Sequence, residues 1–163
     1  MKWDVRSVFT GAAPHLPIED KLDFSDFEFQ GSNPFKEPVS VRGTVDGAGS
    51  VVLLRADVSY RMDGVCDRCL APTTYESSFS IERVLVTSTE NESDDLVVVD
   101  QFMLDLDDLV SAEIWMELPT KTLCREDCRG LCPSCGQNLN EGQCGCSGKS
   151  IDPRLAALAD CLD

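Results

Sequence analysis

The chain has 163 residues, of which 42% are hydrophobic and 7% aromatic, enough to bury one moderate core but hardly two independent ones. Its 29 acidic residues outnumber its 14 basic residues and give a net charge of −15. This charge repels phosphate backbones, so it disfavours a basic groove for nucleic acid and makes basic proteins the natural partners. The N-terminal segment has no apolar run that would suit a secretory signal or a membrane span, so we expect a cytoplasmic protein without membrane contact.

The first 38 residues show the weakest secondary-structure pattern of the chain. We expect two short strands there, at 5–9 and 24–29. The only histidine, His15, lies in a Pro-flanked segment without a metal-binding motif around it, and we expect it to be a surface loop residue.

Period-two alternation predicts strands in the middle of the chain. Val39, Val41 and Val45 fall on one side of the first segment. Between 52 and 62 every second side chain is apolar or aromatic and the intervening ones are mostly polar. A further strand is expected over 73–87, and Asp-Gly-Ala-Gly at 46–49 supplies residues that tolerate the positive φ of a tight hairpin.

The region 84–120 contains ten acidic residues and no Lys or Arg. Its first part should be a solvated loop. Its second part is predicted to be a helix over 105–118, begun by an Asp105 cap and ended by Pro119. The residues expected on its apolar face are Leu106, Val110 and Ile114, with Leu109, Ala112 and Met116 beside them.

Part of this acidity has a local cause, since Asp107 and Asp108 favour the positive end of the helix dipole. The remainder is a candidate docking face for a basic partner; the alternative is that it only keeps the protein soluble. The predicted partner-binding residues are Glu90, Glu92, Asp94, Asp95, Asp107 and Asp108.

Eight cysteines occur in pairs with the spacing of metal-binding knuckles. Disulfides persist only in oxidising compartments, so without an export signal these pairs are predicted to bind metal. Tetrahedral zinc takes four soft ligands, so we expect about two structural zinc ions per chain, with iron as the alternative metal. The predicted ligands are Cys66, Cys69, Cys124, Cys128, Cys132, Cys135, Cys144 and Cys146. The ninth cysteine, Cys161, is expected to be a thiol outside both sites.

Two pairings of these cysteines are possible. In the first, the segment 132–146 forms a local ribbon site, and Cys124 and Cys128 join Cys66 and Cys69 in the other. In the second, the four cysteines between 124 and 135 form one site, and the outer pairs meet in space. We favour the first pairing, because the segment 132–146 has enough residues between its cysteine pairs for a short loop and glycines for tight knuckles.

No catalytic motif accompanies the cysteines. Four-thiolate sites leave no coordination position for a substrate or an activated water. The sequence has no H-E-x-x-H, G-x-S-x-G or G-x-G-x-x-G motif and no phosphate loop. We therefore expect a protein that is not an enzyme and has no small-molecule substrate. A redox-sensing zinc chaperone, which would release zinc on oxidation, is an alternative use of clustered thiols.

Together these patterns predict an α+β fold, with an antiparallel β-sheet or open barrel, a packed helix and a small C-terminal zinc-ribbon-like appendage. The expected units are a β-rich main domain over 1–120, a cysteine-rich zinc-binding segment over 121–150 and a C-terminal helix over 151–163.

The motifs resemble those of the YceD family, the large ribosomal RNA subunit accumulation proteins. The resemblance rests on "GVCDRCL" after an alternating strand, the acidic helix ending in "ELP", "LCREDCRGLCPSCGQNLN" followed by C-x-C, and "IDPRLAAL". It covers 39–158, implies a bacterial cytosolic or plastid protein needed for normal levels of large-subunit rRNA, and marks the eight paired cysteines with Asp152, Pro153 and Arg154.

The resemblance and the charge together predict a non-enzymatic ribosome-biogenesis factor. It would support accumulation of large-subunit (23S) rRNA by binding a basic large-subunit ribosomal protein or a pre-ribosomal particle. The alternatives are direct rRNA contact through the ribbon, for which Arg125, Arg129, Lys149 and Arg154 are candidates, and the redox-sensing chaperone.

Overall fold

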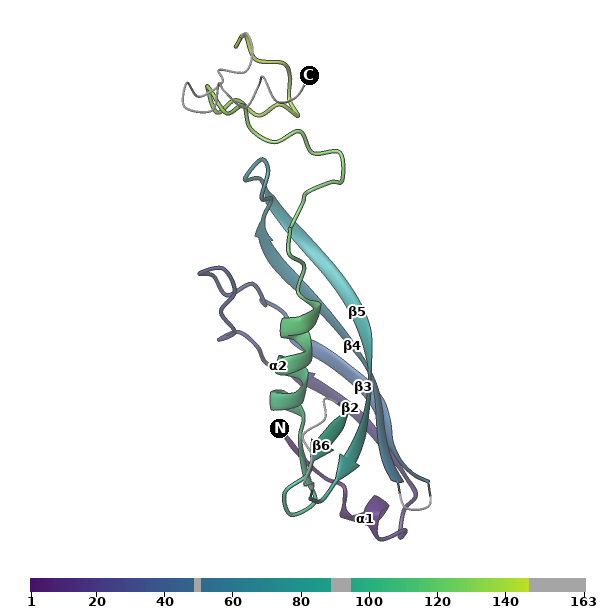
Figure 1. Cartoon of the computed structure of the whole chain (residues 1–163). Helices are drawn as coiled ribbons and strands as arrows, with labels where there is room; N and C mark the ends of the chain where they lie inside the picture. Colours follow the sequence, from purple (N-terminus) through teal and green to yellow (C-terminus); the bar gives the residue numbers. More distant parts are fainter. Residues whose placement is uncertain (49–50, 89–94, 147–163) are drawn as a thin grey trace, which may run out of the picture.

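The computed structural model describes residues 1–48, 51–88 and 95–146. Its main element is a twisted five-stranded sheet in the order β2-β3-β4-β5-β6 (Figure 1). The strands are β2 (His15–Leu22), β3 (Val39–Ala48), β4 (Val51–Val65), β5 (Pro72–Val86) and β6 (Leu96–Val98). Neighbouring strands are antiparallel except β6, which runs parallel to β5. The predicted antiparallel sheet is thus confirmed for four of these strands, and the part of the chain that is described forms an open sheet rather than a barrel.

The alternation in the two central strands places their apolar side chains in the core. In β4 the six side chains at alternate positions from Val52 to Met62 are all buried. Sterics explain the glycine at position 43 in β3, because a Cβ there would overlap the backbone of Arg55 and the side chain of Ala56. The hairpin turn lies later than predicted: Asp46 and Gly47 belong to β3, and Ala48 pairs with Val51.

The expected N-terminal strands were wrong. Residues 5–9 form a helical turn, α1 (Arg6–Phe9), next to the short strand β1 (Lys2–Asp4), which pairs with β7 (Met103–Asp105). Residues 24–29 form no strand; Phe24 and Phe27 instead pack with Phe35 in an aromatic cluster whose ring centroids are 5.2–6.3 Å apart. Aromatic packing, rather than ladder hydrogen bonds, decides the path of this loop.

The strand that sequence analysis missed is β2. Its apolar alternation is interrupted by Asp20, and it contains Pro17. An edge strand tolerates proline, which has no N–H, where the backbone nitrogen faces away from the neighbouring strand. His15, expected in a loop, is the first residue of this strand; its side chain is exposed and its Nδ1 lies 2.6 Å from Oδ1 of Asp46.

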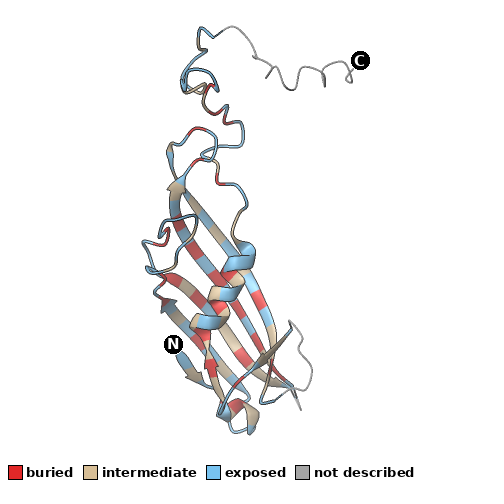
Figure 2. Cartoon of the chain, turned by 60° about the vertical axis from the view of Figure 1, so that its left-hand side comes forward, coloured by how far each residue is buried: buried red, intermediate tan, exposed pale blue. Residues whose placement is uncertain are grey.

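The predicted acidic helix is confirmed as α2 (Leu106–Glu117), which lies across one face of the sheet (Figures 1 and 2). Leu106, Val110 and Ile114 are fully buried, as expected. Two predictions about this helix were wrong. Asp105 occupies the N-cap position but its side chain makes no capping hydrogen bond. Ala112 and Met116 face solvent, because the sheet lies on only one side of the helix.

Beyond α2 the chain runs past the sheet to the cysteine-rich segment, which sits at the end of the β4-β5 hairpin (Figure 1). The C-terminal helix expected over 151–163, with Cys161 and the Asp152, Pro153 and Arg154 signature, lies outside the described residues, as does Lys149. No helix among the described residues is long and apolar enough to cross a membrane.

Candidate metal centres and acidic face

The turn between β4 and β5 presents the first two cysteines. The Cys66 N–H donates to the Ala71 carbonyl at 2.8 Å, and the Leu70 N–H donates to the Cys66 carbonyl at 2.8 Å. Leu70 has φ 59°, a left-handed conformation that tightens the turn. These bonds hold Cys66 and Cys69 in one knuckle with side chains that are 0% and 7% exposed.

The segment after α2 brings two more cysteines to this turn. Cys66 Sγ lies 3.7 Å from Cys128 Sγ, and Cys69 Sγ lies 3.6 Å from Cys124 Sγ. All four sulfur atoms lie within 4.8 Å of one another. Zn–S bonds of about 2.3 Å in a tetrahedron place the sulfurs about 3.8 Å apart, whereas a disulfide needs about 2.05 Å. The spacing of this first group therefore fits four thiolates around one ion.

Backbone and side-chain hydrogen bonds lock the two distant segments together. The Asp67 N–H donates to the Thr122 carbonyl at 2.8 Å, and the Thr122 N–H donates to the Asp67 carboxylate at 2.7 Å. Arg68 donates from its guanidinium to the Cys128 carbonyl at 2.8 Å. Gly130 has φ +75°, and a Cβ there would come within 2.9 Å of the Arg68 carbonyl oxygen. The close contact thus requires glycine at 130.

The second group lies entirely within the segment 132–146. Cys132, Cys135, Cys144 and Cys146 have their sulfur atoms within 4.8 Å of one another. The Gly136 N–H donates to the Cys132 carbonyl at 2.8 Å, and Gly136 has φ +74°, as expected of a knuckle glycine. Only Cys132 is buried in this group, whereas Cys135 and Cys146 are exposed.

Asn140 connects the two groups. Its side-chain amide donates to Cys128 Sγ at 3.4 Å, and its side-chain oxygen accepts the Arg129 N–H and an Arg125 guanidinium N–H, both at 2.8 Å. A hydrogen bond to a ligand sulfur orients the ligand and moderates its charge. The loop of the second group is thus a support for the first.

Backbone donors also prepare the sulfurs for a cation. A backbone hydrogen bond from Cys124 lowers the pKa of Cys66 to about 6, and backbone hydrogen bonds from Cys135 and Ser134 lower the pKa of Cys132 to about 6. Desolvation, then hydrogen bonds with the neighbouring thiols, raise the pKa of Cys124 to about 12. Close thiolates oppose the ionisation of one another, so a divalent cation is what allows all four to be deprotonated.

The eight predicted cysteines are therefore all brought together, in the first of the two pairings. The four residues 124, 128, 132 and 135 do not form one group. Four sulfurs fill a tetrahedral site completely, so each group could hold a structural zinc ion and has no open position for catalysis. The supporting residues Asp67, Arg68 and Asn140 were missed by sequence analysis. Asp67 and Arg68 lie between two ligands, but their partners are 55 or more residues away along the chain.

The predicted acidic face is only partly described. Glu90, Glu92 and Asp94 lie outside the described residues. Asp95 is exposed just before β6. Asp107 forms an ion pair with the N-terminal amine, and Asp108 is exposed in the first turn of α2. Part of the negative charge is thus paired within the chain.

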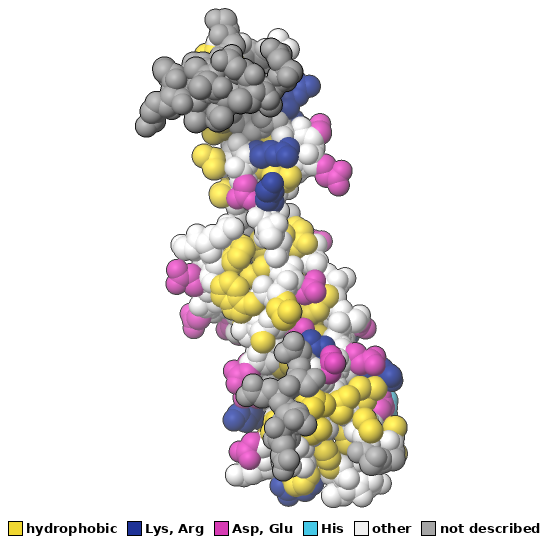
Figure 3. Space-filling view, viewed as in Figure 1, with side chains coloured by type: hydrophobic (Ala, Val, Ile, Leu, Met, Phe, Trp, Pro, Cys, Tyr) yellow, Lys and Arg dark blue, Asp and Glu magenta, His cyan; other side chains and the backbone are white. Residues whose placement is uncertain are grey.

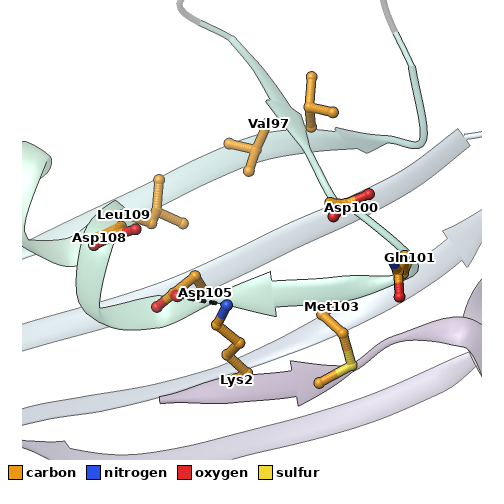
Figure 4. Close-up of a pocket in the computed structure, with 9 residues that line it drawn as sticks. Lys2, Val97, Asp100, Gln101, Met103, Asp105, Asp108 and Leu109 are labelled. Atoms are coloured by element: carbon orange, nitrogen blue, oxygen red, sulfur yellow. Dashed lines mark ion pairs between the residues drawn. The ribbon is translucent and has the colours of Figure 1, made fainter.

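Beside Asp108 the surface is hollowed by a cleft of about 540 Å³ (Figure 4). Its acidic lining is Asp100, Asp105 and Asp108, and its one basic residue, Lys2, pairs with Asp105 at 3.7 Å. Gln101 and four apolar residues complete the lining: Val97, Val98, Met103 and Leu109. Negative charge beside apolar side chains suits a cationic side chain with an aliphatic stem better than it suits a phosphate.

A family model described as "Large ribosomal RNA subunit accumulation protein YceD" matches residues 54–162 of the chain. The uncharacterized protein Rv2926c of Mycobacterium tuberculosis is 31% identical over 123 residues, which are 72% of this chain and 59% of the relative. The uncharacterized protein YlbN of Bacillus subtilis is 24% identical over 166 residues, which are 99% of this chain and 96% of the relative. The match thus spans 59% of the length of the mycobacterial relative. No solved structure matches the chain.

Proposed function

Because the chain belongs to the YceD family of large ribosomal RNA subunit accumulation proteins, we propose that it is a non-enzymatic ribosome-biogenesis factor. It supports the accumulation of large-subunit (23S) rRNA by binding a basic large-subunit ribosomal protein or the protein surface of a pre-ribosomal particle. The family match is the observation that carries this proposal.

The charge of the chain supports a protein partner over naked RNA. A net charge of −15 repels phosphates at long range and attracts proteins rich in Lys and Arg. Among the described acidic residues of α2 and of the adjacent cleft, Asp105, Asp107 and Glu113 are ion-paired within the chain. The other three, Asp100, Asp108 and Glu117, make no ion pair with a described residue. Neutralising a basic ribosomal protein before it reaches rRNA is a task that such a surface suits.

Two structural zinc ions are part of the proposal. The Cys66 group would hold the appendage against the β4-β5 turn, and the Cys132 group would order the loop that contains Asn140. A bound ion would supply the positive charge that four adjacent thiolates need, and it would take no part in chemistry on a substrate. We propose a cytoplasmic location, because cysteines that serve as metal ligands and not as disulfides suit a reducing compartment.

Direct rRNA contact through the appendage is the second candidate function. Three arginines, Arg68, Arg125 and Arg129, each lie next to a cysteine of the first group along the chain. Figure 3 shows Lys and Arg side chains on the surface where the chain leaves the sheet. Arg68 and Arg125 donate hydrogen bonds within the protein, which leaves fewer of their donors for phosphates. Arg129 makes no ion pair or side-chain hydrogen bond with the described residues, so it is the arginine best placed for such a contact.

A native pull-down with and without nuclease separates the two functions. The tagged protein is isolated from cells, and both the bound proteins and the bound RNA are identified. Retention of a large-subunit ribosomal protein after nuclease treatment is the expected result. Recovery of 23S rRNA fragments alone, with no ribosomal protein left after digestion, would favour direct RNA contact and contradict the proposal.

A further inference from the structure

An apolar patch on the outer side of α2 has no partner within the described residues. Trp115 is 54% exposed and the next side chain, Met116, is 82% exposed. The Trp115 ring lies 4.8 Å from Phe27 and 6.1 Å from Phe29, measured between ring centroids. We call Phe27, Phe29, Trp115 and Met116 the outer patch. Aromatic packing holds the Trp115 ring in place, and Met116 follows it in the chain. Exposed Trp and Met side chains are typical of protein interfaces.

A hollow of about 400 Å³ borders the outer patch at Phe29. Its walls include Pro34 from the loop before β3, Met62 and Val65 from the end of β4, and Thr122 from the segment after α2. Val65 is itself 54% exposed. The hollow is large enough for one apolar side chain of a partner, next to a patch on which further apolar side chains can pack. Figure 3 shows hydrophobic side chains gathered on this face of the molecule.

The charge around the outer patch selects its occupant. Of the eight acidic residues in the two segments that form it, 23–37 and 106–117, Glu37, Asp107 and Glu113 are ion-paired within the chain. The one basic residue of these segments, Lys36, lines the hollow. Asp26 and Glu28 flank Phe27, and Glu117 follows Met116; all three are exposed. An apolar patch with an acidic rim is complementary to a segment that has apolar side chains on one side and Lys or Arg on the other.

We propose that the outer patch and its hollow form the docking site for a basic amphipathic segment of the protein partner. This inference rests on the proposed function and assigns its location. A second copy of this chain would bring another acidic rim and a net charge of −15 against the same surface. RNA would meet the exposed carboxylates of Asp26, Glu28 and Glu117, against the single cation of Lys36 in the hollow. The acidic rim thus opposes both of these occupants and attracts the basic protein segment.

The test uses the full chain and individually purified large-subunit ribosomal proteins that are free of RNA. The dissociation constant is measured for the wild type, for Trp115→Ala and for Met116→Lys. The second variant changes a side chain that is 82% exposed, so it preserves the fold while placing a positive charge against a basic partner. Val51→Ala and Val51→Lys are matched controls at a 44% exposed side chain at the other end of β4.

We expect each outer-patch variant to weaken binding about tenfold or more, and both controls to bind within about twofold of the wild type. In a Trp3→Phe background Trp115 is the only tryptophan of the chain. Its emission should shift to shorter wavelength when the ribosomal protein binds, because the indole leaves water.

The outcomes distinguish the two proposals. If the wild type binds none of the ribosomal proteins, the proposed function fails in the form in which a free ribosomal protein is the partner, and this inference fails with it. If the wild type binds one of them but both outer-patch variants bind equally well and the Trp115 emission is unchanged, only the docking site is wrong. A patch variant that dissociates a homodimer while partner binding is unaffected would also overturn the docking site, because it would assign the patch to a second copy.

Discussion

The two cysteine groups draw on different lengths of chain and differ in exposure. The first joins the β4-β5 turn to the segment after α2, with Cys66 and Cys128 separated by 62 positions, and three of its four side chains are buried. The second takes all its residues from 132–146, and two of them are exposed. The first group is therefore a long-range cross-link of the fold, whereas the second organises only the appendage.

Loop closure gives this difference a scale. In the chain-entropy relation, a cross-link that spans about 60 residues removes about 4 kcal/mol of unfolded-state freedom, and one that spans about 12 residues removes about 3 kcal/mol. The cross-link at the first group therefore stabilises the junction of the sheet with the appendage by the larger amount. The cross-link at the second group stabilises, by the smaller amount, a loop that contacts the first group through Asn140.

The largest effect is expected from Cys66→Ser. This variant should lose one of about two zinc ions and should lower the free energy of unfolding by about 4 kcal/mol, because the long-range cross-link is opened. Metal analysis and urea unfolding followed by circular dichroism measure the two quantities. A variant that lost its metal but kept the full stability of the wild type would show that this group does not cross-link the fold.

A smaller effect is expected from Cys132→Ser. It should also lose one zinc ion, but the sheet should lose no more than about 1.5 kcal/mol of its free energy of unfolding, because the second group contacts the first only through Asn140 and its ligands all lie outside the sheet. The measurement is again urea unfolding, followed by the circular dichroism signal of the β-sheet. Destabilisation as large as that of Cys66→Ser would remove the distinction between the two groups.

The second cysteine group, which is the more exposed of the two, should also react first with oxidants. Cys135 and Cys146 are exposed, whereas Cys66, Cys69 and Cys128 are buried. Under mild peroxide, we expect zinc to be released in two phases, which a zinc-sensitive dye follows. Mass spectrometry should find the cysteines of 132–146 modified in the fast phase. No gain of activity against an aggregating client is expected. A gain would support the redox-sensing chaperone instead of a structural role.

The smallest effect is expected from Asn140→Ala. The lost N–H donor to Cys128 Sγ should weaken zinc binding at the first group about tenfold and leave the second group unchanged. Gln137→Ala, at an exposed neighbouring side chain, is the control. Competition with a chelator measures both affinities. Equal loss at both groups, or none, would show that the two groups are not connected through Asn140.

Much of this architecture follows from local patterns. Alternation places the apolar side chains of β4 in the core, and the apolar spacing of Leu106, Val110 and Ile114 predicts α2 to within one residue at each end. Knuckle spacing identifies all eight cysteines that the structure gathers. These signals suffice because each is set by neighbours along the chain.

The remainder depends on contacts between distant segments. β2 forms despite Pro17 because it lies at a sheet edge, and 24–29 is no strand because its phenylalanines pack with Phe35. Met116 was assigned to the apolar side of α2, yet the sheet covers the other side. The support that Asp67 gives to Thr122 is likewise invisible in sequence, because the two residues are 55 positions apart.

The most direct test of the two-centre account is native mass spectrometry of two double variants. In the structure Cys66 and Cys128 share one group, so Cys66→Ser/Cys128→Ser should retain one zinc ion, whereas Cys66→Ser/Cys144→Ser, which damages both groups, should retain none. The competing pairing, with 124, 128, 132 and 135 in one site, gives the opposite pattern. One zinc in the first variant and none in the second is the predicted result; none in the first and one in the second would contradict it.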